Sequence, residues 1–178
     1  MRNPAIQFPV SIMAAFGALW WFLGLALSGH GGLASLVPGL AAAAALVVIA
    51  WRQPPMPEQG SDADRRRVNR VVGIASGAEG VGILVAVNVV ANLGRPDLVM
   101  PAVAIVVGLH FLPLARWLPA PGYYLTGLLM CALGVGACWV QDLAARQVLI
   151  GTGMAALLWL TCGYVLAWSA SRFRPSAA

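Results

Sequence analysis

Hydrophobic residues run along this chain in six long segments that are separated by short polar stretches. A bilayer core about 30 Å thick requires roughly 20 apolar residues of helix, because each helical residue rises about 1.5 Å. All six segments meet that requirement or come close to it, so we predict six transmembrane helices. The predicted spans lie near residues 8–28, 33–51, 68–93, 98–118, 123–141 and 147–171.

Continuous apolar runs of this length cannot be β-barrel strands, which alternate in polarity and run for about 10 residues. The prediction is therefore an all-α, polytopic integral membrane bundle in which residues 1–178 form a single transmembrane domain. We expect the first span to be retained, because 21 apolar residues that include Trp20 and Trp21 exceed the apolar region of a cleaved signal peptide.

Charged residues make up only 10% of the chain, against about 25% in a typical soluble domain, which excludes an ordinary soluble fold. The net charge of +5 comes from eleven arginines without lysine. These arginines stand at the ends of apolar runs, so they indicate lipid headgroups as their partners, and we expect no nucleic acid. Six spans put both termini on one side, and the arginines of that side would be Arg2, Arg52, Arg65, Arg66, Arg67, Arg70, Arg116, Arg172 and Arg174.

The opposite side would hold only Arg95 and Arg146. Cytoplasmic flanks retain positive charge, so this asymmetry predicts that both termini are cytoplasmic in a multi-pass protein of the inner membrane. The loop 52–67 contains three prolines that prevent helix in its first part. Helix is expected to restart near Ser61–Asp64, since Ser61 followed three residues later by Asp64 resembles a capping box.

Glu79 is the only carboxylate inside the predicted spans, and intramembrane acids generally mark functional sites. His110 lies in the next span, beyond the tight turn at residues 94–97. In an antiparallel hairpin, residues at equal depth have numbers with a nearly constant sum, and Glu79 and His110 are centred on that turn. We therefore predict that they lie at the same depth. Two readings of His110 stay open: a partner of Glu79, or a neutral histidine bonded to a backbone carbonyl.

Asn88 and Asn92 are four residues apart and share one face of the third span, which an unbroken helix turns about 180° away from Glu79. We interpret them as amides that bond another helix, or as further groups of the binding site if the helix is broken. Breakage would occur among the glycines beside Glu79. The alternative, which we favour, is that Gly73, Gly77 and Gly80 form a small-residue packing seam, because no proline interrupts the run.

A second small-residue stripe lies on the fifth span at Gly127, Cys131 and Gly134, and we interpret it as a packing seam. The three cysteines all lie in apolar segments without metal-ligand spacing, so we expect no disulfide and no metal site. Trp20, Trp21 and Trp159 lie deep in their spans and are interpreted as core-filling residues. No nucleotide-binding, metalloprotease or nucleophile-elbow motif occurs, so no cofactor is expected and an enzyme is the less favoured class.

Three functions are compatible with these features. The first is a transporter or channel subunit that uses Glu79 and the nearby His110 to bind a proton, a cation or a basic solute. The chain is short for a complete transport path, so we expect this subunit to form a homo-oligomer. The second is a non-catalytic accessory or assembly protein that docks another membrane protein through its small-residue seams. The third is a lipid-binding or lipid-modifying protein with the same two residues as acid and base.

Overall fold

The computed structural model describes residues 6–53, 61–117 and 122–172. In these ranges the chain forms six α-helices and one 3-10 turn: α1 (Gln7–Leu27), α2 (Leu33–Arg52), α3 (Asp62–Asn92), η1 (Pro96–Leu98), α4 (Val99–Trp117), α5 (Gly122–Ala137) and α6 (Leu143–Arg172). The all-α prediction is confirmed. Among the described helices, α1, α2, α3, α4 together with η1, and α6 are long and apolar enough to cross a membrane, whereas α5 is apolar but has only 16 residues.

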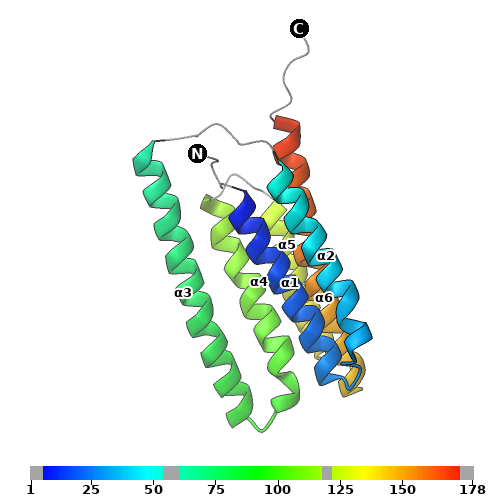
Figure 1. The fold of residues 1–178 in the computed structure, drawn as a ribbon. Helices are drawn as coiled ribbons and strands as arrows, with labels where there is room; N and C mark the ends of the chain where they lie inside the picture. The colour runs from blue at the N-terminus through cyan, green and yellow to red at the C-terminus, as the bar shows by residue number, and fades with distance from the viewer. Residues whose placement is uncertain (1–5, 54–60, 118–121, 173–178) are drawn as a thin grey trace.

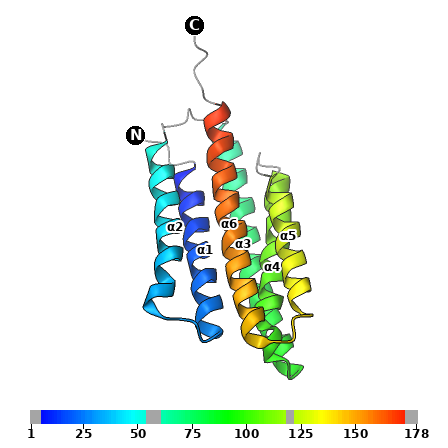
Figure 2. The same cartoon turned by 90° about the vertical axis from the view of Figure 1, so that its right-hand side faces the viewer.

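The helices lie side by side and alternate in direction (Figure 1). Each packs against the next in the spatial order α2, α1, α6, α5, α4, α3, and α6 also contacts α2 and α4 (Figure 2). As a result, α3 stands at one edge of the bundle and makes its main contacts with α4 and η1. The beginnings of α1, α3 and α5 and the ends of α2, α4 and α6 share one end of the bundle, which we call the α2–α3 end.

Hydrogen bonds between side chains and backbone carbonyls join neighbouring helices. The Trp21 indole N–H donates to the Ser35 carbonyl between α1 and α2, at 2.8 Å. The Trp159 indole N–H donates to the Ala14 carbonyl between α6 and α1, at 3.2 Å. The two rings also face each other with centroids 5.9 Å apart, so these deep tryptophans fill the core as expected and have their polar atoms satisfied.

Two glycines of α1 allow close approach to α6. A Cβ added to Gly24 would lie 2.6 Å from the Gly151 Cα, which places the α1 and α6 backbones in direct contact. A Cβ added to Gly17 would lie 2.4 Å from the Trp159 indole nitrogen. Helices in membrane proteins associate through such small residues together with interhelical hydrogen bonds. The α1–α6 seam is therefore built on glycines that the sequence pattern did not single out.

Helix α3 begins where the capping box predicted. The Ser61 hydroxyl accepts from the Asp64 backbone N–H, and the Asp64 carboxylate accepts from the Ser61 backbone N–H. These reciprocal bonds satisfy donors that every helix N-terminus leaves open. The helix then runs unbroken to Asn92, so the alternative in which the glycines near Glu79 break it is wrong.

The predicted boundaries of the fifth and sixth spans need correction. Helix α5 ends at Ala137 rather than near residue 141, because the chain tightens into turns in which the backbone N–H of Val140 donates to the Ala137 carbonyl. Helix α6 begins at Leu143, four residues earlier than predicted, because the Asp142 carboxylate accepts from the Ala145 backbone N–H and caps it.

Candidate functional site

The candidate site lies in the hairpin of α3 and α4. Gly94, with a φ of +68°, adopts the left-handed conformation that reverses the chain, and the Arg95 N–H donates to the Val90 carbonyl at the end of α3. Residues of α3 that are not fully exposed recur every three or four positions, which defines one narrow contact stripe towards α4. Its members are Val68, Val71, Ala75, Glu79, Gly82, Ile83, Ala86, Val87 and Val90.

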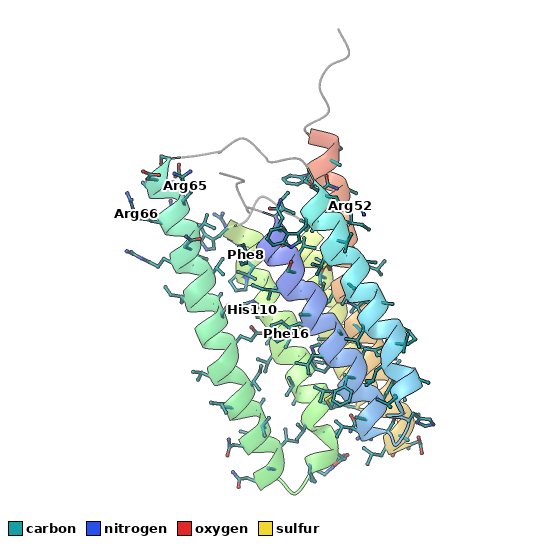
Figure 3. All side chains as sticks on the ribbon, in the orientation of Figure 1. Phe8, Phe16, Arg52, Arg65, Arg66 and His110 are labelled. Atoms are coloured by element: carbon teal, nitrogen blue, oxygen red, sulfur yellow. The ribbon has the colours of Figure 1, made fainter. Side chains whose placement is uncertain are left out.

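Glu79 and His110 meet across this hairpin. The His110 Nδ1 atom lies 3.7 Å from the Glu79 Oε2 atom and 3.1 Å from the Ala75 carbonyl oxygen (His110 is labelled in Figure 3). Of the two readings that the sequence left open, the bond to a backbone carbonyl is present, whereas Glu79 is a close neighbour of His110 without a direct hydrogen bond to it. Their shared depth follows from the antiparallel hairpin, as predicted.

The carbonyl contact fixes the tautomer of His110. A carbonyl oxygen only accepts hydrogen bonds, so Nδ1 must carry a hydrogen and donate it to Ala75. The Nε2 atom, which has no hydrogen-bond partner among the described residues, is then the position that gains or loses a proton. At 3.7 Å the carboxylate lies beyond hydrogen-bond distance from Nδ1, whose hydrogen is donated to Ala75.

Glu79 borders the bundle edge, whereas His110 is enclosed. The side chain of His110 is 10% exposed and that of Glu79 is 25% exposed. The exposed side of α3 next to Glu79 carries Gly73, Gly77 and Gly80, and a Cβ at any of the three would meet nothing within 4 Å. In the described structure these glycines therefore pack against no other helix, and a seam at this position would need a second chain.

The two asparagines do not join the site. Asn88 and Asn92 are exposed, and the Asn88 side-chain amide donates to the Leu84 carbonyl of its own helix at 2.7 Å. Among the described residues, the expectation that Asn88 bonds another helix is wrong, because its amide bonds its own helix and no described helix packs on that face of α3. The prediction that Asn88 and Asn92 face away from Glu79 is confirmed, since α3 is unbroken and turns both amides to the opposite side of the helix.

The stripe on α5 packs against α4. A Cβ at Gly127 would lie 2.6 Å from the Gly108 carbonyl oxygen, and one at Gly134 would lie 2.8 Å from the Pro101 carbonyl oxygen. Between them the Cys131 thiol donates to the Ile105 carbonyl at 3.6 Å. This close contact packs α4 against α5, and α4 in turn positions His110.

Arg146 has a structural role that the sequence did not predict. It was expected in a loop, yet it lies in the first turn of α6 with only 4% of its surface exposed. Its guanidinium donates twice to the Val140 carbonyl, at 2.9 and 2.6 Å, and also to the Asp97 carbonyl and carboxylate, at 3.1 and 2.8 Å. Arg146 thereby joins η1, α6 and the turn after α5, at the end of the bundle opposite the α2–α3 end.

A second arginine completes this ion cluster. Arg95 donates from Nε and Nη2 to both carboxylate oxygens of Asp97, at 3.0 Å each. The Asp97 carboxylate raises the pKa of the Arg95 guanidinium, because the bidentate hydrogen bond and the charge attraction both favour the protonated form. This cluster anchors the turn below Glu79 and His110.

No group of three or more histidine, cysteine or acidic side chains that could hold a metal ion is found in the ranges 6–53, 61–117 and 122–172. The strongest chemical arrangement in the described chain is thus the paired carboxylate and imidazole. Comparison of the chain with protein-family models, with curated proteins and with solved structures finds no match.

Proposed function

We propose that this chain is a multi-pass inner-membrane protein with cytoplasmic termini, and that Glu79 and His110 bind a proton, a cation or a basic solute during transport. The arginine distribution supports the orientation. The α2–α3 end carries Arg52, Arg65, Arg66, Arg67, Arg70, Arg116 and Arg172, and the opposite end carries Arg95 and Arg146. Figure 3 labels Arg52, Arg65 and Arg66. Positive residues are retained on the cytoplasmic side, so the α2–α3 end would face the cytoplasm. Arg2 and Arg174 lie outside the described residues.

The observation that carries the proposal is the contact of 3.7 Å between His110 Nδ1 and Glu79 Oε2 in an apolar helix hairpin. With Glu79 ionised and His110 neutral, the pair has one negative charge and attracts a cation. A proton taken up at His110 Nε2 makes the pair neutral and removes that attraction. Protonation and cation binding would therefore exclude each other, which is the basis for coupling the two.

The position of α3 supports a conformational step. A helix whose main contacts are with α4 and η1 can shift relative to the bundle with fewer lost contacts than a central helix. In this mechanism the shift of α3 would expose Glu79 alternately to the two sides of the membrane. Because one short chain offers little enclosure, the functional unit would be a homo-oligomer in which the open glycine face of α3 meets a second chain.

Proteoliposomes that contain a pH-sensitive dye test the transport proposal. Outward gradients of Na⁺, K⁺ or guanidinium should change the internal pH with the wild-type protein, and Glu79→Gln should abolish the change. His110→Gln should leave cation binding but uncouple it from pH. Asn88→Ala is the matched control, because it removes a polar group of the same helix on the opposite face. Unchanged coupling in Glu79→Gln would refute the proposal.

A second candidate is an accessory protein that docks a different membrane protein. The observation in its favour is that Gly73, Gly77 and Gly80 are open to close approach while α3 has one main neighbour. In that case Gly77→Leu should abolish co-purification of the partner, whereas Glu79→Gln should leave every flux unchanged.

A further inference from the structure

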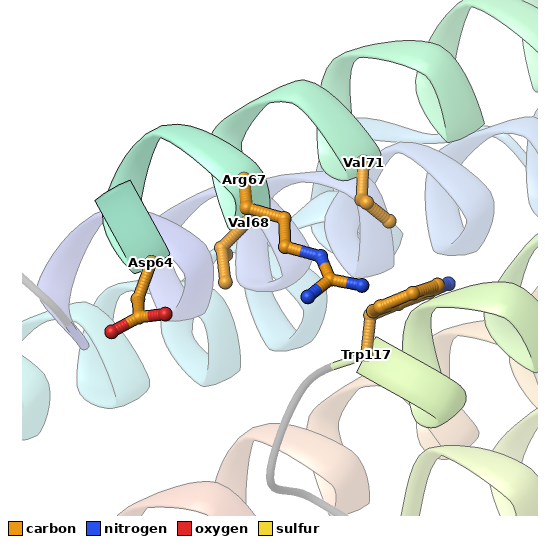
Figure 4. A pocket seen from close by; sticks show the side chains of 5 residues that line it. All are labelled: Asp64, Arg67, Val68, Val71 and Trp117. Carbon is orange, nitrogen blue, oxygen red and sulfur yellow. The ribbon is translucent and has the colours of Figure 1, made fainter. Parts of the chain in front are cut away.

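A small cavity lies at the α2–α3 end, where the beginning of α3 faces the end of α4. Its volume is about 250 Å³, and it is lined by Asp64, Arg67, Val68, Val71 and Trp117 (Figure 4). One cation, one anion and one aromatic ring thus surround a floor of two valines. The cavity is separate from the Glu79 and His110 pair, which lies about two helical turns further along the hairpin.

The cationic side of the cavity offers N–H donors that suit a phosphate group. The Arg67 guanidinium carbon lies 4.5 Å from the centroid of the Trp117 ring, and that of Arg116 lies 5.6 Å from the same centroid. Contact with a ring uses the π-face and leaves the in-plane N–H donors available. In the described part of the chain, neither guanidinium has an ion pair or hydrogen bond to a carboxylate. Arginine N–H groups match the geometry of phosphate oxygens.

The anionic side of the cavity offers a carboxylate oxygen that can accept from an ammonium group. The Oδ2 atom of Asp64 accepts from the Ser61 backbone N–H at 3.0 Å and from the Ser61 hydroxyl at 2.7 Å. A carboxylate has about four acceptor positions, so Oδ1 retains acceptor capacity, and no donor within the described ranges occupies it. Asp64 and Arg67 are three residues apart on α3, which places their opposite charges on neighbouring positions of one helix surface.

We infer that this cavity binds the phosphoethanolamine headgroup of a cytoplasmic-leaflet phospholipid, with the phosphate on Arg67 and the ammonium on Asp64. Trp117 forms the wall, and Val68 and Val71 offer apolar contact to the first carbons of the acyl chains. The inference rests on the proposed membrane location and orientation. A phosphoglycerol headgroup offers Asp64 no cation, and a choline headgroup carries a cation that cannot donate a hydrogen bond, so ethanolamine should be preferred to both.

Native mass spectrometry of the full chain in detergent tests the inference. Phosphatidylethanolamine, phosphatidylglycerol and phosphatidylcholine with identical acyl chains would be added separately, and the dissociation constant of the first bound lipid would be measured. We expect wild type to bind phosphatidylethanolamine several-fold more tightly than the other two. Arg67→Gln should weaken binding of all three lipids about tenfold. Asp64→Asn should keep phosphate binding but remove the preference for ethanolamine.

Arg66→Gln is the matched control, because it removes the same charge from the adjacent residue, which points away from α4 (Figure 3). It should leave all three constants unchanged, and circular dichroism should show equal helix content in every variant. Equal weakening by the Arg66 and Arg67 substitutions, or an unchanged preference in Asp64→Asn, would overturn the inference. So would competition by millimolar free phosphoethanolamine or inorganic phosphate as strong as that by the lipid, since the ligand would then be soluble.

Two readouts separate failure of this inference from failure of the proposed function. Resistance of the wild-type protein to extraction from membranes at alkaline pH tests the membrane location. Cation-coupled pH change in proteoliposomes of phosphatidylglycerol alone tests the Glu79 site without the preferred lipid. Lipid selectivity can thus fail while the membrane location and the Glu79 site survive.

Discussion

Replacement of Arg146 by Met should destabilise the bundle more than replacement of any other arginine of the described chain by an uncharged residue. The guanidinium makes four hydrogen bonds to two acceptor residues and is almost fully buried. A hydrogen bond to a charged group contributes about 1.5–3 kcal/mol. Because bonds that share an acceptor are not additive, we expect a total loss of about 3 kcal/mol in the free energy of unfolding. Met keeps the apolar stem, so the loss isolates the guanidinium.

Thermal unfolding in detergent, followed by circular dichroism, measures this loss. A change of about 1 kcal/mol shifts Tm by about 2–4 °C in a chain of this size, so Arg146→Met should lower Tm by about 6–12 °C. Arg95→Gln is the matched control, because Arg95 contacts the same Asp97 from a side chain that is 55% exposed, and it should change Tm little. Equal Tm values for the two variants would refute the assignment of Arg146 as the link between η1, α6 and the turn after α5.

Two further changes test the packing and the start of α3. Gly24→Ala should destabilise the protein by about 1–3 kcal/mol, because its Cβ would lie 2.6 Å from the Gly151 Cα. In the monomer in detergent, Gly77→Ala should be neutral or stabilising by up to about 1 kcal/mol, since its position is open within one chain and Ala favours helix; thermal unfolding of the two variants should give Tm changes that differ in sign or size. Ser61→Ala should cost about 1 kcal/mol of local stability by loss of the cap, seen as faster amide exchange over the first turns of α3 while Tm changes little.

Apolar run length and local signals were sufficient to predict much of the fold. The capping residues Ser61 and Asp64 identified the start of α3, because the bonds that form a capping box lie within three residues. The centre of the turn between α3 and α4 was sufficient to predict that Glu79 and His110 lie at one depth. Both predictions depend on short-range geometry, which the sequence carries directly.

The features that the sequence did not predict depend on contacts between residues far apart in the chain. Apolar residues continue past Ala137, so the hydropathy pattern predicted a longer α5. In the structure α5 ends at Ala137, and the Arg146 guanidinium donates to the Val140 carbonyl in the turn that follows. The charge of Arg146 suggested a loop, because the partners that allow its burial come from a distant turn. The choice between an internal and an external seam at Gly77 likewise depends on whether another helix lies beside α3, which residue type cannot indicate.

Nitrogen-15 NMR of labelled histidine tests the central claim most directly, because the chain has only two histidines and His30→Gln leaves His110 alone. The account predicts that neutral His110 carries its hydrogen on Nδ1 and leaves Nε2 without one. Added K⁺ or guanidinium should change the His110 nitrogen chemical shifts in the presence of Glu79 and not in Glu79→Gln. A hydrogen on Nε2 in the neutral form, or cation-induced changes that are the same in both variants, would contradict it.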